Sequence, residues 1–450
     1  MGRDIRLLTA LAATLIVAPT LSASGFQLRE QNPAAQGNSF AGVTAGYGGL
    51  GSEFFNPAAL SLVDGRQMLI GLSSVMPSAE LYGAVGTRSA ALPAPVRPIS
   101  GPSAYGDAAH NAILPNLAAV WSMTDDLKIG LAVAAPYGLV TEYPTDFVGR
   151  YHGLKSDLKT VDVAVSAAYR FSPRFAAGAT VLYRKAEATL TTGVDFGLVA
   201  SSLGTTPGTL DGVASLKGSK GAIGMKLGAI FTPTPQLRIG LAHQAAMNME
   251  LSGDATYQFP STMPAPLVAG LQARGFKDGE GRAELRLPSV SSIGVDWDLN
   301  GAFSIQAEAA QTGWSTFKEL RVKFSTGLPD SVTDEYWKDA WYYSLGASWK
   351  VSDSLVLRAG VARDQSAVDE VHRTPRIPDS DRSWVSVGAS WSVGQRLTLD
   401  FGYSHIAVQN GSLALAAGVD PAGQNFSRGN LTGTYTSGIE VIALAARFRF

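Results

Sequence analysis

Apolar and polar side chains alternate with a period of two residues along most of this chain. In the segment 162–171 the odd positions are Val163, Val165, Ala167, Tyr169 and Phe171. The even positions are small or polar: Asp162, Ala164, Ser166, Ala168 and Arg170. Successive side chains of a β-strand point to opposite faces, so this period predicts strands with one apolar and one polar face. The pattern recurs at 292–299 and 385–393.

The spacing of these segments indicates how the strands are connected. We predict about 14 strands, at 67–83, 111–123, 126–141, 158–171, 174–191, 218–232, 236–251, 284–299, 302–312, 338–351, 354–364, 382–393, 396–407 and 437–450. Turns of a few residues alternate with long connections such as 84–110 and 252–283. Tight turns at one end and long loops at the other are typical of outer-membrane barrels, and a soluble sandwich has no reason for them. The sequence therefore predicts an all-β protein, an antiparallel β-barrel in the outer membrane of a Gram-negative bacterium.

Both ends of the chain agree with export to that membrane. Arg3 and Arg6 precede an apolar run from Leu7 to Val17 and then small residues, which predicts a signal peptide at 1–23 cleaved near Ala23. The last strand places apolar side chains on one face and ends on the aromatic Phe450. A terminal aromatic after an alternating strand is similar to the signal that the barrel-assembly machinery reads, and we expect that machinery as a partner during biogenesis.

Composition excludes several function classes. A net charge of −1 offers no basic field for nucleic acid. The absence of cysteine excludes thiolate metal sites and thiol nucleophiles. The chain has neither a Gly-x-Ser-x-Gly elbow nor a His-Glu-x-x-His pair. We therefore expect no enzyme activity, no catalytic residues, no metal and no cofactor.

The segment 24–66 does not follow the strand pattern. It is rich in Gly, Ala, Asn and Ser, yet it carries apolar side chains that favour burial, including Phe26, Phe40 and Phe54. A barrel of about 14 strands has an interior that wall side chains alone do not fill. We predict that 24–66 is a hatch that plugs the lumen of a barrel formed by 67–450. The alternative is a disordered periplasmic tail.

Several motifs resemble the FadL family of outer-membrane long-chain fatty-acid transporters. They are Ser24-Gly-Phe-Gln-Leu28, Asn56-Pro-Ala58, Pro136-Tyr-Gly-Leu139, Asp146-Phe-Val-Gly-Arg-Tyr-His152, Trp314-Ser-Thr-Phe317 and Ile377-Pro-Asp-Ser-Asp-Arg-Ser-Trp384. They occur in the family's order and cover almost the whole mature chain. The family includes a branch associated with toluene and other monoaromatic hydrocarbons, and two of the motifs are at least as similar to that branch.

The resemblance implies a mechanism and a set of site residues. It implies a hatch that contains Phe26, Asn56, Pro57 and Ala58, and an inward kink in the third strand at Pro136, Tyr137 and Gly138 that opens a lateral passage. Proline removes a ladder donor and glycine weakens a strand, so a bend at this position is also what the residues themselves indicate. A ligand captured by long extracellular loops would move the hatch and leave sideways into outer-membrane lipid. We expect a monomer.

The sequence does not identify the ligand. A fatty-acid carboxylate favours a basic partner, and strand parity points Arg170, Arg184 and Arg358 into the lumen as possible polar contacts. Each is also a candidate for a structural ion pair with an Asp or Glu. In the fatty-acid members a basic residue lies a few positions after the aromatic that matches Tyr183. Here the stretch 186–190 contains none, and the basic residues of this neighbourhood are only Arg184 and Lys185. This leaves monoaromatic hydrocarbons such as toluene as an alternative, with a polar-solute porin behind both. For the loop aromatics Trp314, Phe317, Tyr336 and Trp337, an interfacial girdle is favoured over ligand guidance.

Overall fold

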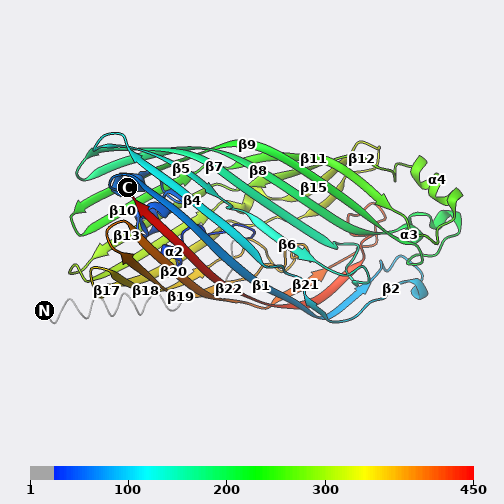
Figure 1. Ribbon diagram of the computed structural model, residues 1–450. Coiled ribbons are helices and arrows are strands. Elements are labelled where there is room, and N and C mark those ends of the chain that lie inside the picture. Colours follow the sequence, from blue (N-terminus) through cyan, green and yellow to red (C-terminus); the bar gives the residue numbers. More distant parts are fainter. Residues whose placement is uncertain (1–24) are drawn as a thin grey trace.

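The computed structural model describes residues 25–450, and its strands form one closed antiparallel barrel (Figure 1). Strand β1 (Gln67–Thr87) pairs on one side with β4 (Ala112–Ser122) and on the other with the last strand, β22 (Asn430–Arg449). First and last strands therefore meet, as they must where no water can satisfy an open edge. The predicted strand number is confirmed, because the wall contains 14 strands within the described residues.

The wall strands follow one another around the barrel in chain order, and three of them consist of two segments. Between β4 and β22 they are β5 (Leu127–Ala134) with β6 (Gly138–Glu142), β7 (Lys155–Ser172), β8 (Phe175–Asp195), β9 (Asp211–Thr234), β10 (Leu237–Gln244) with β11 (Met247–Gln258), β12 (Gly279–Leu287) with β13 (Val290–Asp298), β14 (Phe303–Thr312), β17 (Ala340–Lys350), β18 (Leu355–Asp364), β19 (Arg382–Val393) and β20 (Leu397–Val408).

Short turns lie at one end of the barrel and long connections at the other, as predicted. The long connections carry β2 (Pro98–Ile99), β3 (Tyr105–Asp107), β15 (Glu319–Phe324), β16 (Ser331–Asp334), β21 (Gly411–Leu415), η4 (Ala94–Val96), α3 (Phe196–Val199), η5 (Ser201–Leu203), α4 (Ala265–Ala273) and η6 (Trp314–Thr316). Figure 1 shows them at the right-hand end, opposite the carboxyl terminus. No described helix is long or apolar enough to cross a membrane.

Several predicted strand ends near the long connections were wrong. The sixth strand begins at Asp211 and not at 218, the seventh ends at Gln258 and not at 251, the eighth begins at Gly279 and not at 284, and the last begins at Asn430 and not at 437. In β9 the missed start precedes a glycine- and lysine-rich stretch, 217–221, whose own strand propensity is low. Pairing with β8 and β11 on either side holds that stretch extended. The ends of these strands near the long connections depend on pairing with neighbouring strands. The residue pattern within one strand carries no information about that pairing.

The two faces of the wall are those that the alternation predicted. Val163 and Val165 of β7 are about half exposed on the outside of the barrel, whereas Ser166 of the same strand lies on the inside and is 1% exposed. Val385 and Val387 repeat this outward orientation on β19. The apolar face of each strand is thus the lipid-facing one, since a barrel has no other apolar partner for it.

The hatch fills the lumen at the end of the short turns. Its elements are α2 (Pro33–Gln36), η1 (Val43–Ala45), η2 (Gly49–Phe54) and η3 (Pro57–Leu62), and nearly all of their residues are buried. α2 packs on β19 and β20, η1 on β10 and β13, and η3 on β7, β8 and β9, so the hatch contacts the wall on several sides. The predicted signal peptide, 1–23, lies outside the described residues.

Glycines on the inner wall allow this close packing. A Cβ at Gly240 would lie 1.9 Å from the carbonyl oxygen of Thr44, and one at Gly360 would lie 2.2 Å from that of Asn38. Both positions therefore need glycine, because any side chain would overlap with the backbone of the hatch.

Replacing Val387 with arginine is expected to destabilise the folded barrel by about 2–4 kcal/mol, the cost of a charged side chain facing lipid near the bilayer midplane. Urea unfolding in lipid vesicles measures this free energy. Val387→Leu is the control and should leave stability nearly unchanged. If Val387→Arg were as stable as the wild type, β19 would not present this face to lipid.

Candidate functional site

The third wall strand is interrupted at residues 135–137, between β5 and β6 (the break). β5 pairs with β4 as far as Leu117 opposite Val133. Beyond that point β6 pairs with β7, and only an isolated bridge joins Ala109 to Thr141 on the β4 side of the described wall. Pro136 has no N–H to donate, which is why the ladder cannot continue through this position. The predicted kink residues therefore lie at a gap in the wall's hydrogen bonding.

The first residues of the hatch take the place of the missing strand partner. Leu28 N donates to Pro136 O at 2.8 Å, and Gly138 N donates to Phe26 O at 3.1 Å. On the other side of the break, Tyr137 N donates to Thr160 Oγ1 at 3.0 Å. The hatch residue Phe26 and the predicted kink residues are thus brought together by backbone hydrogen bonds, and displacement of 26–28 would remove the inner partner of the break.

A cavity of about 640 Å³ lies at the break (the wall cavity). Its lining reaches from interior residues such as Phe26 and Ile377 to Ile113 and Val161, which face outward. Ile113 is 70% exposed. The cavity therefore extends from the lumen to the lipid-facing side of the wall.

A smaller apolar cavity of about 70 Å³ lies deeper in the barrel (the inner cavity). Its apolar lining includes Leu190, Leu216, Leu251, Leu285 and Phe317. Four apolar side chains line both this cavity and the wall cavity: Phe26, Leu139, Leu158 and Ile377. These side chains stand between the two spaces.

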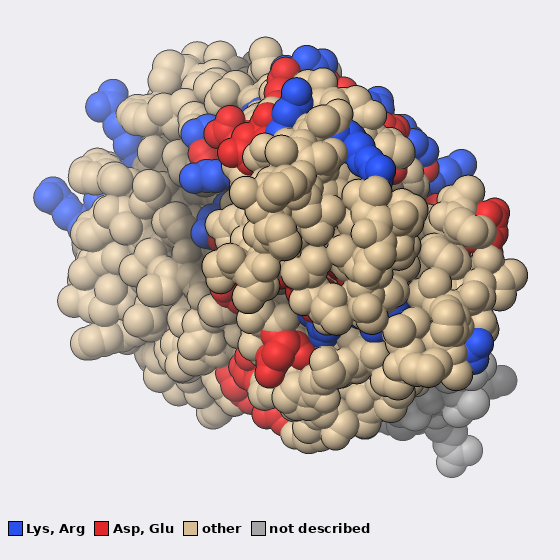
Figure 2. Space-filling model, turned by 90° about the vertical axis from the view of Figure 1, so that its right-hand side faces the viewer, with Lys and Arg blue, Asp and Glu red and all other residues tan. Residues whose placement is uncertain are grey.

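A third cavity of about 90 Å³ opens among the long connections (the outer groove) and is lined by Tyr151, His152 and Arg428. It shares Leu190, Leu216, Leu320 and Arg376 with the inner cavity. Outer groove, inner cavity and wall cavity therefore form a series of adjoining spaces. Figure 2 looks onto the end with the long connections, where uncharged residues form most of the surface around the hollows.

Phe26 is held at the inner end of this series by an aromatic cluster. Its ring centroid lies 4.6 Å from that of Trp314 and 5.6 Å from that of Trp337, and Phe317 and Tyr137 complete the contact. Trp314, Phe317 and Trp337 are 0%, 3% and 3% exposed. The interfacial girdle predicted for them was wrong, because they pack inward on the hatch. Only Tyr336 of that group is exposed.

The Asn-Pro-Ala motif anchors the hatch to the wall. Asn56 Oδ1 accepts from Ala58 N at 2.9 Å and caps η3, whose first residue is Pro57. Asn56 Nδ2 donates to Thr44 O within the hatch at 2.7 Å and to Ala229 O of β9 at 3.1 Å. One side chain therefore joins two hatch helices and the wall.

The three predicted lumen arginines are placed differently from one another. Arg184 makes two 2.6 Å bonds to Asp162 and lies 4.7 Å from the centroid of the Tyr137 ring. Arg358 donates to Tyr47 Oη at 2.7 Å, holding the hatch near the short turns. Arg170 is exposed beside Asp126 in a short turn. None of the three lines the outer groove, the inner cavity or the wall cavity.

The charged or titratable cavity residues that were not predicted include His152, Glu335, Arg376 and Arg428. All four lie in long connections, where strand parity gives no information about orientation. Burial, with the positive charges of Arg428 and Arg376, lowers the pKa of His152 to about 3, so the imidazole is neutral at physiological pH. Burial raises the pKa of Glu335 to about 8. The only sequence signals were that His152 ends the quoted motif 146–152 and that Arg376 directly precedes the quoted motif 377–384.

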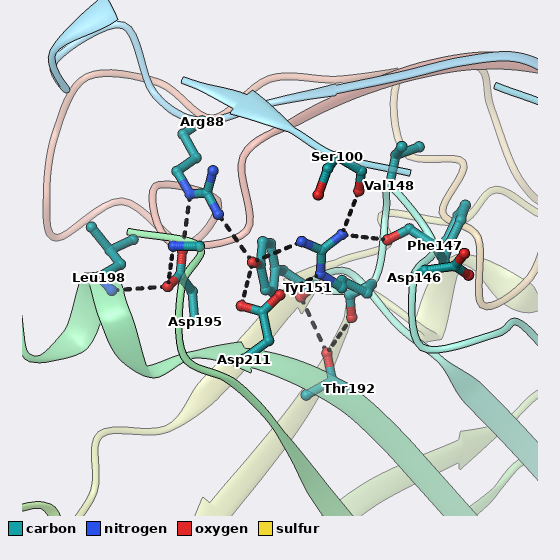
Figure 3. A network of polar contacts seen from close by, with 12 residues as sticks. Arg88, Ser100, Asp146, Phe147, Val148, Tyr151, Thr192, Asp195, Leu198 and Asp211 are labelled. Carbon is teal, nitrogen blue, oxygen red and sulfur yellow. Dashed lines mark hydrogen bonds and ion pairs between the residues drawn. The ribbon is translucent and has the colours of Figure 1, made fainter. Parts of the chain in front are cut away.

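A buried polar network fixes one side of the outer groove (Figure 3). Arg88 pairs with Asp195 at 2.9 Å, and Arg150 pairs with Asp211 at 2.9 Å. Tyr151 Oη accepts from Arg88 and donates to Asp211 at 2.7 Å. These contacts join three separate long connections, so the Tyr151 side of the groove is preformed.

Asn56→Ala is expected to loosen the hatch, since Thr44 O and Ala229 O lose their donor at a cost of about 1–3 kcal/mol. Single-channel conductance in planar bilayers should rise as the plug opens more often. Ser61→Ala is the matched control in the same helix, because Ser61 Oγ donates only locally, to Ala58 O. Conductance equal to that of the wild type would show that Asn56 does not hold the plug.

A family model described as "Outer membrane protein transport protein (OMPP1/FadL/TodX)" matches residues 14–450. The "47 kDa outer membrane protein" of Pasteurella multocida is 31% identical over 88% of this chain and 91% of its own length. The "Long-chain fatty acid transport protein" of Escherichia coli K12 is 26% identical over 89% and 91%.

Solved structures agree on the fold. A Pseudomonas aeruginosa FadL homologue superposes with a TM-score of 0.85 at 23% identity, covering 95% of this chain and all of the homologue. The Pseudomonas putida toluene transporter TodX gives 0.67 at 17% identity, covering 95% and 100%. Within the described residues there is no group of His, Asp and Glu side chains that could hold a metal ion.

Proposed function

The chain belongs to the OMPP1/FadL/TodX family of outer-membrane transport proteins, and on this premise we propose that it takes up hydrophobic compounds, long-chain fatty acids or related lipids, across the outer membrane. The observation that carries the proposal is the series of adjoining cavities from the long connections to the break in the wall. Its family relatives are transport proteins, and we propose a transporter without enzymatic activity that acts as a monomer and is assembled by the barrel-assembly machinery.

The route begins at the outer groove and ends in lipid. The ligand enters among the long connections, passes the leucines shared with the inner cavity, and reaches Phe26. There it exits through the wall cavity, past Ile113 and Val161, into the outer membrane. Each methylene group that stays out of water along this route lowers the free energy of the ligand by about 0.8 kcal/mol. An apolar chain therefore favours the lateral exit over a water-filled lumen.

The space below the break supports a lateral exit. A cavity there is lined in part by the ionisable side chains of Glu53, Lys226, Asp162 and Glu308 and is bounded by the hatch. An apolar ligand that continued toward the periplasm would have to desolvate these polar groups, which is costly. The same hatch disfavours a polar-solute porin, because its residues are packed against the wall on several sides.

The hatch controls the exit in this proposal. Residues 26–28 pair with the break, and Phe26 lines both the inner cavity and the wall cavity. A ligand in the inner cavity contacts the same ring that separates it from the wall cavity. Displacement of Phe26 therefore opens the passage and unpairs the break in one movement.

Monoaromatic hydrocarbons such as toluene are the second candidate. The similarity to TodX and the leucine-rich part of the inner cavity's lining favour a small apolar ligand as much as an acyl chain. Both candidates use the same route.

Saturable binding of an apolar ligand is expected for the purified, detergent-folded protein. The buried tryptophans Trp314 and Trp337 lie beside Phe26, so their fluorescence reports binding near the gate. Separate titrations with oleate and toluene choose between the two ligand classes, with a hydrophilic sugar as the control. Sugar permeation in a liposome-swelling assay without binding of either apolar ligand would contradict the proposed function.

Pro136→Val combined with Gly138→Val is expected to abolish uptake while the barrel still folds. Valine restores an N–H at 136 and strand propensity at both positions, which favours a continuous third strand. Uptake of labelled ligand by whole cells measures the effect, and heat-modified mobility on gels confirms folding. Pro235→Val, in the short turn between β9 and β10, is the control. Undiminished uptake in the folded double variant would exclude the break as the exit.

A further inference from the structure

Two arginines from separate long connections line the outer groove without a contacting carboxylate. Arg376 donates to the carbonyl oxygens of Lys155 and Thr191 at 3.0 and 3.1 Å and to Ser156 Oγ at 3.1 Å. Arg428 donates to Thr333 Oγ1 at 3.0 Å and to Ser331 Oγ at 3.2 Å. Within the described chain no carboxylate oxygen lies within 4.0 Å of either guanidinium. Their positive charges are thus held by neutral acceptors.

Three fully buried arginines of this protein are neutralised by direct ion pairs, whereas the buried Arg29 and Arg373 have no carboxylate partner in the described part of the chain. Arg88, Arg150 and Arg184 each contact an aspartate at 2.9, 2.9 and 2.6 Å. Arg376 and Arg428 are partly buried. Withdrawing a cation from water without such a partner is costly, and burial together with Arg428 lowers the pKa of Arg376 to about 10. Both arginines remain charged at neutral pH, and this end of the passage is therefore prepared for an anion.

The position of the pair matches the polar end of an amphiphile. Arg376 lines both the outer groove and the inner cavity, so its guanidinium lies where the two spaces meet. Beyond it the lining is apolar, with Leu190, Leu216 and Leu320 shared by both cavities. A head group at the arginines would place its hydrocarbon chain among these leucines and direct it toward Phe26.

The nearest buried acid is Glu335, which lines the same inner cavity as Arg376. Its Oε2 accepts from Trp337 Nε1 at 2.9 Å, and its Oε1 has no hydrogen-bond donor. The charges that act on it are Arg376 and Arg428, which lower its pKa, and Asp334, which raises it. Burial outweighs the arginines and holds the pKa at about 8, so Glu335 is largely neutral at pH 7 and ionised at pH 9.

We propose that Arg376 and Arg428 form a subsite for the carboxylate of an amphiphilic ligand, and that Glu335 is an internal carboxyl that competes for the same pair. The proposal rests on the proposed function and narrows it to an anionic, long-chain ligand. A neutral hydrocarbon gains nothing from the arginines. When Glu335 carries its proton the pair is available to the ligand, and when Glu335 ionises it takes up part of the same positive charge.

The test compares oleate with oleyl alcohol, which has the same chain and no carboxylate. Binding to the full-length, detergent-folded protein is measured by tryptophan fluorescence at pH 7. Arg376→Gln and Arg428→Gln, made singly, are each expected to weaken oleate binding about tenfold or more, the usual loss for a charge-assisted hydrogen bond. Affinity for oleyl alcohol should change less than twofold. Arg274→Gln, which removes an exposed charge beyond α4, is the matched control and should change neither.

Glu335→Gln separates electrostatic competition from packing. Glutamine retains an acceptor for Trp337 Nε1 and cannot ionise. Between pH 7 and pH 9 the wild type should lose oleate affinity severalfold as Glu335 ionises, whereas Glu335→Gln should lose less, because the pH dependence of oleate itself is common to both. Identical pH profiles would exclude Glu335 as a competitor and overturn that part of the proposal.

The other outcomes are distinguishable. If the wild type binds neither oleate nor oleyl alcohol, the proposed function fails. If the wild type binds oleate and both arginine variants bind it equally well, the proposed transport function is retained and the proposed carboxylate subsite is contradicted. An equal loss of oleate and oleyl alcohol in folded variants also overturns the subsite, since it would show that the arginines support the pocket by packing alone. Arg428→Gln removes only contacts with other side chains. It can therefore still test the subsite if Arg376→Gln fails to fold.

Discussion

The hydrogen-bonding needs of the backbone in lipid determine the rest of this structure. Each wall residue must pair with a neighbouring strand, because no water is present at membrane depth to replace a lost partner. The pairing of β1 with β22 closes the sheet and satisfies this requirement around the barrel. An opening in such a wall is possible only where something other than a wall strand supplies the missing partners.

At the break, the hatch supplies them. Leu28 and Phe26 pair with Pro136 and Gly138 from inside, and Thr160 pairs with Tyr137 from the adjacent strand. The hatch is therefore both the plug of the lumen and part of the wall. This double role couples the inner cavity, which Phe26 lines, to the hydrogen bonding of the wall a few residues away.

The wall could be predicted from the sequence because a lipid-facing strand carries a two-residue period that depends on no distant residue. Pro136 and Gly138 were also predictable, since proline and glycine act on their own backbone. Loop side chains carry no such local signal. Trp314 and Trp337 turn inward because Phe26, nearly 300 positions away, packs on them. Arg376 and Arg428 line one groove only because two long connections fold over it. Strand parity could point only to arginines of the wall strands, such as Arg184, whose charge Asp162 already neutralises.

The contacts of residues 26–28 also set how often the protein is open in the absence of a stimulus. Two backbone hydrogen bonds contribute about 1 kcal/mol each, and burial of the Phe26 ring contributes about 2 kcal/mol. A total of about 4 kcal/mol corresponds to roughly one molecule in a thousand with the segment detached at any moment. In the proposed mechanism, thermal fluctuation alone therefore samples the detached form only rarely, and a bound ligand must supply the free energy that displaces the segment.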